Sequence, residues 1–265
     1  MIKLFYIFLV LQFHPLLSTD LPNLLLTAKA YCIQELSSKK IIIEKNSKEA
    51  FPMASLTKLG TALMSSEKIE PFEYLKIPSF AIVKNNYESK ADLIENESYL
   101  FQDLLYGLLL PSGNDVARSL SFQLESKGFK FSNLSKDWIQ KNNLSDFYFE
   151  ESVGLSSKSK TNINDLMIIL DLVEKNKNIF NVLQKKEYSF ESKNGKSITV
   201  KSRTPIFKNK ELIIFGKTGR TKSAGQCFAG FFQKKTKLFK IAILGSENLE
   251  SDLLVSSEFI NNFID

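Results

Sequence analysis

The chain has 265 residues, a formal net charge of +6 and 43% hydrophobic residues, with 22 phenylalanines, which suits one large folded domain and argues against disorder. All but three of its 35 basic residues are lysines. The lysines are scattered along the chain and no nucleic-acid-binding module is recognisable, so no nucleic-acid partner is expected.

The N-terminal segment has the pattern of a secretory leader. Lys3 supplies a short basic region, residues 4–17 are mostly apolar, and Ser18-Thr-Asp20 returns to small and polar residues. We expect residues 1–18 to be a signal peptide, because the apolar run is shorter than the about 20 apolar residues that a membrane span needs. An uncleaved N-terminal anchor is the alternative. Both alternatives place a single domain over residues 19–265 in the periplasm or at the outer face of the cytoplasmic membrane, with loose membrane association allowed.

The rest of the chain alternates between strand and helix patterns. The first expected strands span residues 28–35 and 40–45, and the last ones follow a hairpin at 188–200 that turns at Asn194-Gly195. Helical spacing of apolar residues predicts the elements between and after them. The remaining expected helices span residues 55–67, 100–109, 114–127, 162–176 and 248–264, and the remaining strands span residues 211–217, 225–233 and 238–245.

This order predicts an α/β (α+β) fold. Two early strands and three late strands can share one mostly antiparallel, five-stranded sheet if the middle of the chain is an excursion. We therefore expect helices on the sheet and an all-helical lobe over roughly residues 60–165. Cys32 and Cys227 each lie in an apolar, strand-like run, and we expect two buried thiols, although export would allow a disulfide.

Histidine is the most informative absence in the sequence. The only one is His14, which lies within the expected leader. A mature chain without histidine cannot run a Ser-His-Asp site or build a histidine-based zinc centre. If this protein activates a serine, the base has to be a lysine.

Ser55-Leu-Thr-Lys58 offers such a pair at the start of an expected amphipathic helix. The spacing brings Lys58 one turn along the same face as the serine hydroxyl, near the positive end of the helix dipole. An ordinary N-cap is the alternative for Ser55. The Ser-x-x-Lys pattern alone is weak in so lysine-rich a chain, since it recurs at Ser37/Lys40, Ser65/Lys68 and Ser157/Lys160.

Two further motifs follow in order. Ser112-Gly-Asn114 comes after Pro111, at the break between two apolar helices, where its side chains can face a cleft. Lys217-Thr-Gly219 ends an apolar strand, and the glycine there allows a substrate backbone to approach closely. A helix cap and a solvated strand end are the alternatives when each motif is taken alone.

Together the three motifs resemble those of the serine-type D-alanyl-D-alanine carboxypeptidases, the low-molecular-mass penicillin-binding proteins. The resemblance runs from about Ala28 to the C-terminus and covers more than the three motifs. It is carried by Pro52-Met-Ala-Ser-Leu-Thr-Lys58, Leu110-Pro-Ser-Gly-Asn-Asp-Val-Ala117, Val153-Gly-Leu155, Asn164-Asp-Leu-Met, Gly216-Lys-Thr-Gly-Arg-Thr221 and Ala224-Gly225.

The resemblance implies a role for each motif residue. Ser55 would attack the bond between two D-alanines at the end of a peptidoglycan stem peptide, with Lys58 as base, its pKa depressed by burial and by Lys217. Ser112 would pass a proton to the leaving amine and Asn114 would orient the substrate and Lys58. The remaining substrate-binding residues would be Lys217, Thr218, Gly219 and Arg220, with the oxyanion held by the backbone N–H groups of Ser55 and Arg220.

The same resemblance implies covalent inhibition by β-lactams and no metal or organic cofactor. Relatives often carry histidine or an aromatic residue where Arg220 stands, and an arginine where Gly245-Ser-Glu-Asn248 stands. We therefore expect Arg220 to bind the terminal carboxylate. No C-terminal β-domain is expected after the final helix.

Three other functions remain as alternatives. A DD-endopeptidase that cuts cross-links shares these motifs. A class A β-lactamase would need Ser-Asp-Asn, where Gly113 stands in the middle position, and a deacylating glutamate in a Glu-x-x-Leu-Asn context, which does not follow Asn114. A catalytically inactive peptidoglycan-binding protein is the alternative that is not an enzyme.

Overall fold

The computed structural model describes residues 26–204, 208–209 and 212–263. The expected signal peptide, residues 1–18, lies outside the described residues. Within the described ranges, no helix is both long and apolar enough to cross a membrane.

One antiparallel sheet organises the molecule, with the strand order β2-β1-β12-β11-β10-β9. The five expected strands are confirmed, and a two-residue strand, β9 (Lys208–Asn209), adds to the edge of β10. The other strands are β1 (Ala30–Glu35), β2 (Ile41–Lys45), β10 (Leu212–Thr221), β11 (Gly225–Lys234) and β12 (Lys237–Ser246).

Strand β10 is longer than expected. The apolar run predicts a strand over residues 211–217. In the structure β10 continues to Thr221, since each of its residues pairs with β11 down to the final pair, Thr221 with Gly225. Lys217-Thr-Gly219 therefore lies inside a strand rather than at its end.

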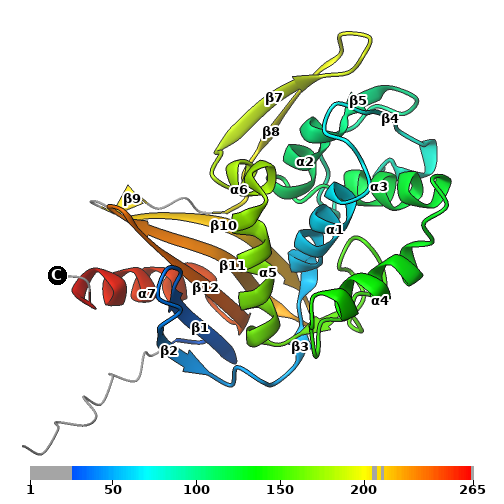
Figure 1. Ribbon diagram of the computed structural model, residues 1–265. Coiled ribbons are helices and arrows are strands. Elements are labelled where there is room, and N and C mark those ends of the chain that lie inside the picture. Colours follow the sequence, from blue (N-terminus) through cyan, green and yellow to red (C-terminus); the bar gives the residue numbers. More distant parts are fainter. Residues whose placement is uncertain (1–25, 205–207, 210–211, 264–265) are drawn as a thin grey trace, which may run out of the picture.

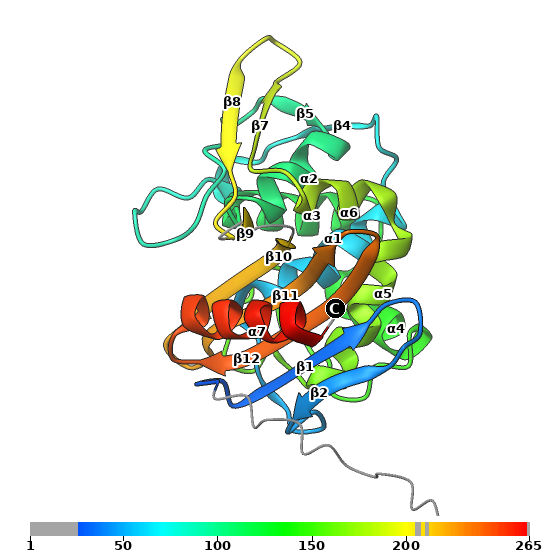
Figure 2. The same ribbon diagram turned by 90° about the vertical axis from the view of Figure 1, so that its left-hand side faces the viewer.

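Both faces of the sheet are covered, as the alternation along β11 illustrates. Phe228 and Phe232 point to one face, which the last helix, α7 (Leu249–Phe263), covers. Cys227 and Phe231 point to the other, where they join the large core shared with the remaining helices. Figure 2 shows α7 across the front of the sheet and the other helices behind it.

The helices between β2 and β10 form a lobe on the other face of the sheet (Figure 1). Helices α5 and α6 lie against the sheet and α1 packs beside α5. The helices of this part are α1 (Thr57–Ser66), α2 (Phe101–Leu109), α3 (Asn114–Ser126), α4 (Phe131–Lys141), α5 (Ile163–Lys175) and α6 (Lys177–Leu183), with 3-10 turns η1 (Ala54–Leu56) and η2 (Ser79–Ala81).

The expectation of an all-helical lobe over residues 60–165 is wrong in two respects. The excursion continues to about residue 201, and it contains short antiparallel ribbons as well as helices. These ribbons are β4 (Tyr74–Lys76) with β5 (Ser98–Leu100), β7 (Glu187–Glu191) with β8 (Ser197–Lys201), and β3 (Phe51–Pro52) with β6 (Lys160–Thr161).

Helix α4 was missed because its apolar pattern is sparse. It buries Phe131 and Trp138 but is polar at most other positions. The expected hairpin at 188–200 is confirmed as β7 and β8. Cys32 and Cys227 are buried and not bonded to each other, as expected.

Candidate active site

Ser55 lies in the 3-10 turn η1, between the short strand β3 and helix α1. Helix α1 begins at Thr57 and its N-cap is Leu56, so Ser55 is not the cap that the sequence allowed. Ala54 has φ of 48°, a left-handed conformation that is unfavourable for a residue with a Cβ. Such strained residues cluster at functional sites. The turn holds Ser55 half-buried at the end of α1, facing the cavity described below.

Lys58 lies under Ser55 with its side chain completely buried. Its Nζ donates hydrogen bonds to Ser55 Oγ at 3.2 Å, to Asn114 Oδ1 at 2.9 Å and to the carbonyl oxygen of Val153 at 2.7 Å. An ammonium group has three N–H donors, and all three find acceptors here. The amine is thus fixed beside the serine hydroxyl.

Burial lowers the pKa of Lys58 to about 7, although the carboxylates of Glu151 and Asp115 oppose the shift. The nearby Arg118 cation lowers the Lys58 pKa further. Lys58 also repels Lys217, the cation expected from the sequence. Lys217 is itself almost completely buried, and burial, the charge of Lys58 and Arg203 together hold its pKa well below the usual value. A neutral Lys58 amine near pH 7 is therefore accessible.

The Ser112-Gly-Asn114 motif lies where expected, between α2 and α3. Asn114 begins α3 and is nearly completely buried. Ser112 has φ of 65°, and its buried Oγ has no hydrogen-bond partner among the described residues. A buried hydroxyl without a partner is costly unless a ligand, a water or a reacting group meets it.

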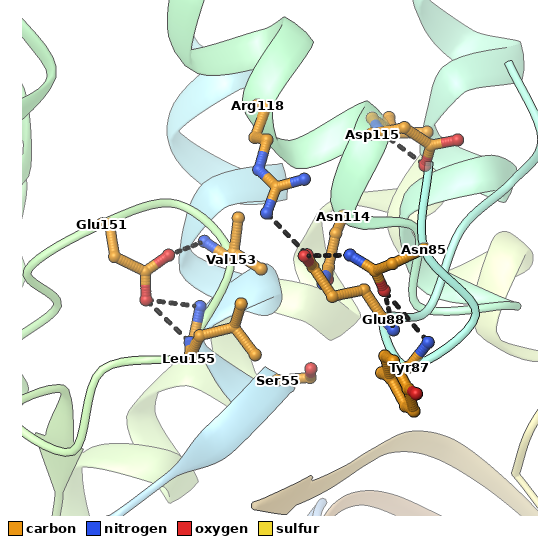
Figure 3. Close-up of polar contacts among 12 residues, drawn as sticks. Ser55, Asn85, Tyr87, Glu88, Asn114, Asp115, Arg118, Glu151, Val153 and Leu155 are labelled. Carbon is orange, nitrogen blue, oxygen red and sulfur yellow. Dashed lines mark hydrogen bonds and ion pairs between the residues drawn. The ribbon is translucent and has the colours of Figure 1, made fainter. Parts of the chain in front are cut away.

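The loop that contains Val153-Gly-Leu155 closes the other side of the site (Figure 3). The carboxylate of Glu151 accepts hydrogen bonds from the backbone N–H groups of Val153, Gly154, Leu155 and Ser156, at 2.7 to 3.2 Å. This places the Val153 carbonyl against Lys58. In the sequence, the resemblance points to Val153-Gly-Leu155, and no motif points to Glu151.

Strand β10 supplies the remaining candidates. The Lys217 Nζ donates to the carbonyl oxygen of Thr218 at 2.8 Å. Thr218 is half-buried and Arg220 is exposed. Strand β9 pairs with β10 only at Leu212 and Ile213, so the described part of the sheet leaves the motif segment without a neighbour on that edge.

A cavity of about 570 Å³ unites the motifs. Its lining includes Ser55, Ser112, Thr218, Gly219, Arg203 and Arg220. Ser55, Ser112 and residues of Lys217-Thr-Gly219 thus meet although they are far apart in the sequence, as predicted. Among the described residues, no cluster of three or more His, Cys, Asp or Glu side chains could hold a metal ion.

Arg203 is a site residue that none of the three motifs indicates. It follows the β7–β8 hairpin, its backbone N–H donates to the carbonyl oxygen of Leu110, and its guanidinium group donates to Ser89 Oγ. All three arginines of the chain lie at this site: Arg203 and Arg220 line the cavity, and Arg118 binds a carboxylate that contacts Asn114. The rarity of arginine in this chain is a sequence feature that points to Arg203 as a binding residue, because planar guanidinium groups suit carboxylate recognition.

The fold is that of a known class of proteins. The structure superposes on the DD-transpeptidase of a Streptomyces strain with a TM-score of 0.80, at 20% sequence identity, covering 89% of this chain and 96% of that one. The architecture is therefore the DD-peptidase fold.

The sequence places the chain in one family within that class. The family model of D-alanyl-D-alanine carboxypeptidases matches residues 18–248, and the chain belongs to this family. Similar curated proteins include the carboxypeptidases DacD of Salmonella typhimurium, 26% identical, and DacD of Escherichia coli, 25% identical, each over 75% of this chain. The chain spans about half the length of these relatives, 53% in each case.

Proposed function

We propose that this protein is a serine-type D-Ala-D-Ala carboxypeptidase that removes the terminal D-alanine from peptidoglycan stem peptides. The observation that carries the proposal is the contact of Lys58 Nζ with Ser55 Oγ at 3.2 Å, together with a Lys58 pKa of about 7. A nucleophile within reach of a base that is neutral near pH 7 is the requirement for acyl transfer. Family membership supports the same activity.

In the acylation step, Ser55 Oγ attacks the carbonyl carbon between the two D-alanines and Lys58 accepts the hydroxyl proton. The C–N bond then breaks, an ester forms on Ser55, and the proton passes to the leaving D-alanine amine. We assign this transfer to Ser112, because its unpartnered Oγ lines the same cavity. Asn114 keeps Lys58 in place through the 2.9 Å hydrogen bond.

Two negative charges have to be bound during the reaction, the oxyanion and the terminal carboxylate of the substrate. We assign both to β10 and the residues around it. The backbone N–H groups of Ser55 and Arg220 would hold the oxyanion. Thr218, Arg220 and the buried Lys217 would meet the terminal carboxylate. Arg203, which also lines the cavity, adds a second guanidinium group and strengthens the anionic preference of the site.

In the deacylation step, water attacks the ester carbonyl, Lys58 again accepts the proton, and the shortened peptide and Ser55 hydroxyl are released. A β-lactam would acylate the same serine, since its amide takes the place of the D-Ala-D-Ala bond. We propose export of the chain to the compartment that holds peptidoglycan, on the strength of the leader pattern in residues 1–18.

The direct experiment incubates the purified protein with an acylated L-Lys-D-Ala-D-Ala peptide and measures free D-alanine, with Ser55→Ala as control. Release by the wild type alone supports the proposal. Release only from a cross-linked dimer of stem peptides would identify a DD-endopeptidase. Rapid turnover of penicillin would indicate a β-lactamase, and binding without any release would indicate an inactive peptidoglycan-binding protein.

A further inference from the structure

One carboxylate at the site has no part in the three motifs. Glu88 lies on the loop between η2 and β5, and its Oε2 accepts a hydrogen bond from Asn114 Nδ2 at 2.8 Å. The same oxygen accepts from the Arg118 guanidinium group at 2.5 Å. Figure 3 shows Glu88 reaching toward Asn114 and Arg118 from the loop opposite Glu151.

The loop is anchored so that Glu88 has little freedom. Asn85 caps its turn: Asn85 Oδ1 accepts from the backbone N–H groups of Tyr87 and Glu88, and Asn85 Nδ2 donates to Glu88 Oε1 at 3.0 Å. The backbone N–H of Asn114 donates to the carbonyl oxygen of Ser89 at 2.8 Å. The loop and the Ser-Gly-Asn segment therefore form one hydrogen-bonded unit.

A second anchor lies further along the loop. The buried Asp115 carboxylate accepts from the backbone N–H groups of Ala91 and Leu93 at 3.0 to 3.1 Å. Helix α3 thus contributes Asn114 to the site, Asp115 to the loop anchor and Arg118 to Glu88, all within its first two turns.

The Asn114 amide can be presented to Lys58 in two ways. With Oδ1 toward Lys58, it accepts from the amine at 2.9 Å. Rotated by half a turn, its NH₂ group would face the Lys58 N–H donors, and the hydrogen bond that Lys58 donates to Oδ1 would be lost. A carboxylate only accepts, so Glu88 binds the NH₂ side and fixes the productive orientation. Arg118 in turn supplies the counter-charge for this half-buried carboxylate.

We propose that Glu88 is a positioning residue for acylation, which holds the Asn114 amide oxygen on Lys58 and is itself held by Arg118. The inference rests on the proposed function, because Lys58 is taken as the base. It predicts that the loop carrying Glu88, rather than the motif residues alone, sets the orientation of the base.

The charges around Lys58 give this proposal a signature in the pH profile. The charged groups that act on Lys58 are Glu151 and Asp115, Arg118 and Glu88, with Lys217 on the strand side. Glu88 raises the pKa of Lys58 and Arg118 lowers it. Removing Glu88 and removing Arg118 should therefore shift the acid limb of the pH profile, where the acylation rate rises with pH, in opposite directions. Loss of folding alone would not do this.

The test measures acylation by a fluorescent penicillin between pH 5 and 9 for the full chain and four variants. Glu88→Ala should lower the plateau rate by about tenfold or more, with little change in apparent affinity, and shift the acid limb to lower pH. Arg118→Ala should shift the limb to higher pH. Glu88→Gln, which keeps an acceptor for Asn114 Nδ2, should recover part of the plateau. Glu95→Ala, an exposed carboxylate on the same loop, is the matched control and should match the wild type.

The outcomes separate this inference from the proposed function. If the wild type is acylated and Glu88→Ala retains its plateau and pH profile, the positioning role is wrong while the proposed function stands. If the acid limbs of Glu88→Ala and Arg118→Ala shift in the same direction, the positioning role is also wrong. If the wild type itself is not acylated and releases no D-alanine, the proposed function fails instead. Thermal unfolding of each variant identifies any loss of rate that comes from misfolding.

Discussion

Gly219 lies against the backbone of Ser55: a Cβ at position 219 would be 2.9 Å from the Ser55 nitrogen and 3.2 Å from the carbonyl oxygen of Met53. Strand β10 thus approaches η1 more closely than any side chain would allow. This contact brings the Lys217-Thr-Gly219 motif to the proposed nucleophile, and it explains why the third motif residue is a glycine.

Gly219→Ala should therefore displace η1 by several tenths of an ångström. We expect penicillin acylation to fall by about 100-fold, since small misplacements of a nucleophile have effects of this size. The cost in unfolding free energy should be only about 1–3 kcal/mol, as for other overpacked sites. Lys222→Ala, an exposed residue on the turn that follows, is the control. A normal acylation rate in Gly219→Ala would show that η1 does not depend on this approach.

The pH dependence of acylation tests the role of Lys58. Burial lowers its pKa to about 7, so the neutral amine predominates above that pH. We expect the acylation rate to rise through pH 7 and then level off. Lys58→Arg should show no acylation at any pH, because a guanidinium group stays protonated. A midpoint near the ordinary lysine pKa of about 10.4 would contradict the assignment.

The same shift has a consequence for stability. In the unfolded chain Lys58 keeps a pKa of about 10.4, whereas in the fold its pKa is about 7. Between these values the unfolded state binds more protons, so the Lys58 contribution makes the fold more stable as pH rises through that window. The cost of burying the charge is fully present below pH 7. Comparing the pH dependence of urea unfolding in wild type and Lys58→Met isolates this contribution.

The motifs predicted which residues lie together, because short polar motifs with fixed spacing can be recognised between apolar runs. Ser55, Lys58, Ser112 and Asn114 meet as expected, and so does the β10 segment. Glu88 and Glu151 could not be predicted, and only the rarity of arginine pointed to Arg203. Each acts through a loop whose path depends on tertiary anchoring and carries no periodic signal, as the Asp115 contacts with the loop backbone illustrate.

Among the elements, the five main strands and the longer apolar helices followed from their periodicity, and the β7–β8 hairpin followed from its Asn194-Gly195 turn. Helices α4 and α6 and the ribbons β3–β6 and β4–β5 did not follow from the sequence pattern. The two boundary errors have different tertiary causes. Polar residues at 218–221 continue β10 because β11 pairs with them, and pairing is not visible in the local pattern. The start of α1 at Thr57 depends on the strained turn at Ala54, which no residue propensity predicts.

Glu151 should influence Lys58 in two ways. It holds the loop whose Val153 carbonyl accepts from Lys58 at 2.7 Å, and its charge raises the Lys58 pKa. Glu151→Ala should lower the plateau rate of acylation and shift the acid limb to lower pH. Glu150→Ala, the neighbouring carboxylate, which binds Lys158 at the surface, is the matched control. An unchanged acid limb in Glu151→Ala would contradict this role.

An ion pair between a buried lysine and a half-buried aspartate joins the lobe to the sheet. Lys240 on β12 is almost completely buried, and its Nζ donates to Asp171 Oδ1 on α5 at 2.8 Å and to the carbonyl oxygen of Met167 at 3.0 Å. Asp171→Ala should lower the unfolding free energy by about 3 kcal/mol, because it leaves a buried ammonium group without its counter-charge. Lys240→Met, of similar volume and without charge, should cost far less in the same urea titration.

Arg220 tests recognition of the substrate carboxylate. If Arg220 binds the terminal carboxylate, Arg220→Ala should reduce D-alanine release from a peptide with a free carboxylate by about tenfold or more. Cleavage of the corresponding peptide amide, which lacks that charge, should fall much less. Lys222→Ala, two residues further along, serves as the control. Equal D-alanine release by Arg220→Ala and wild type would transfer the role to Arg203 or Lys217.

The central claim is that Ser55 is a nucleophile activated by Lys58. Intact-protein mass spectrometry after incubation with benzylpenicillin tests it most directly, followed by peptide mapping of the adduct. We expect one covalent adduct on the peptide that contains Ser55, and none in Ser55→Ala or Lys58→Met. An unmodified wild-type protein, or an adduct on any other residue, would contradict the claim.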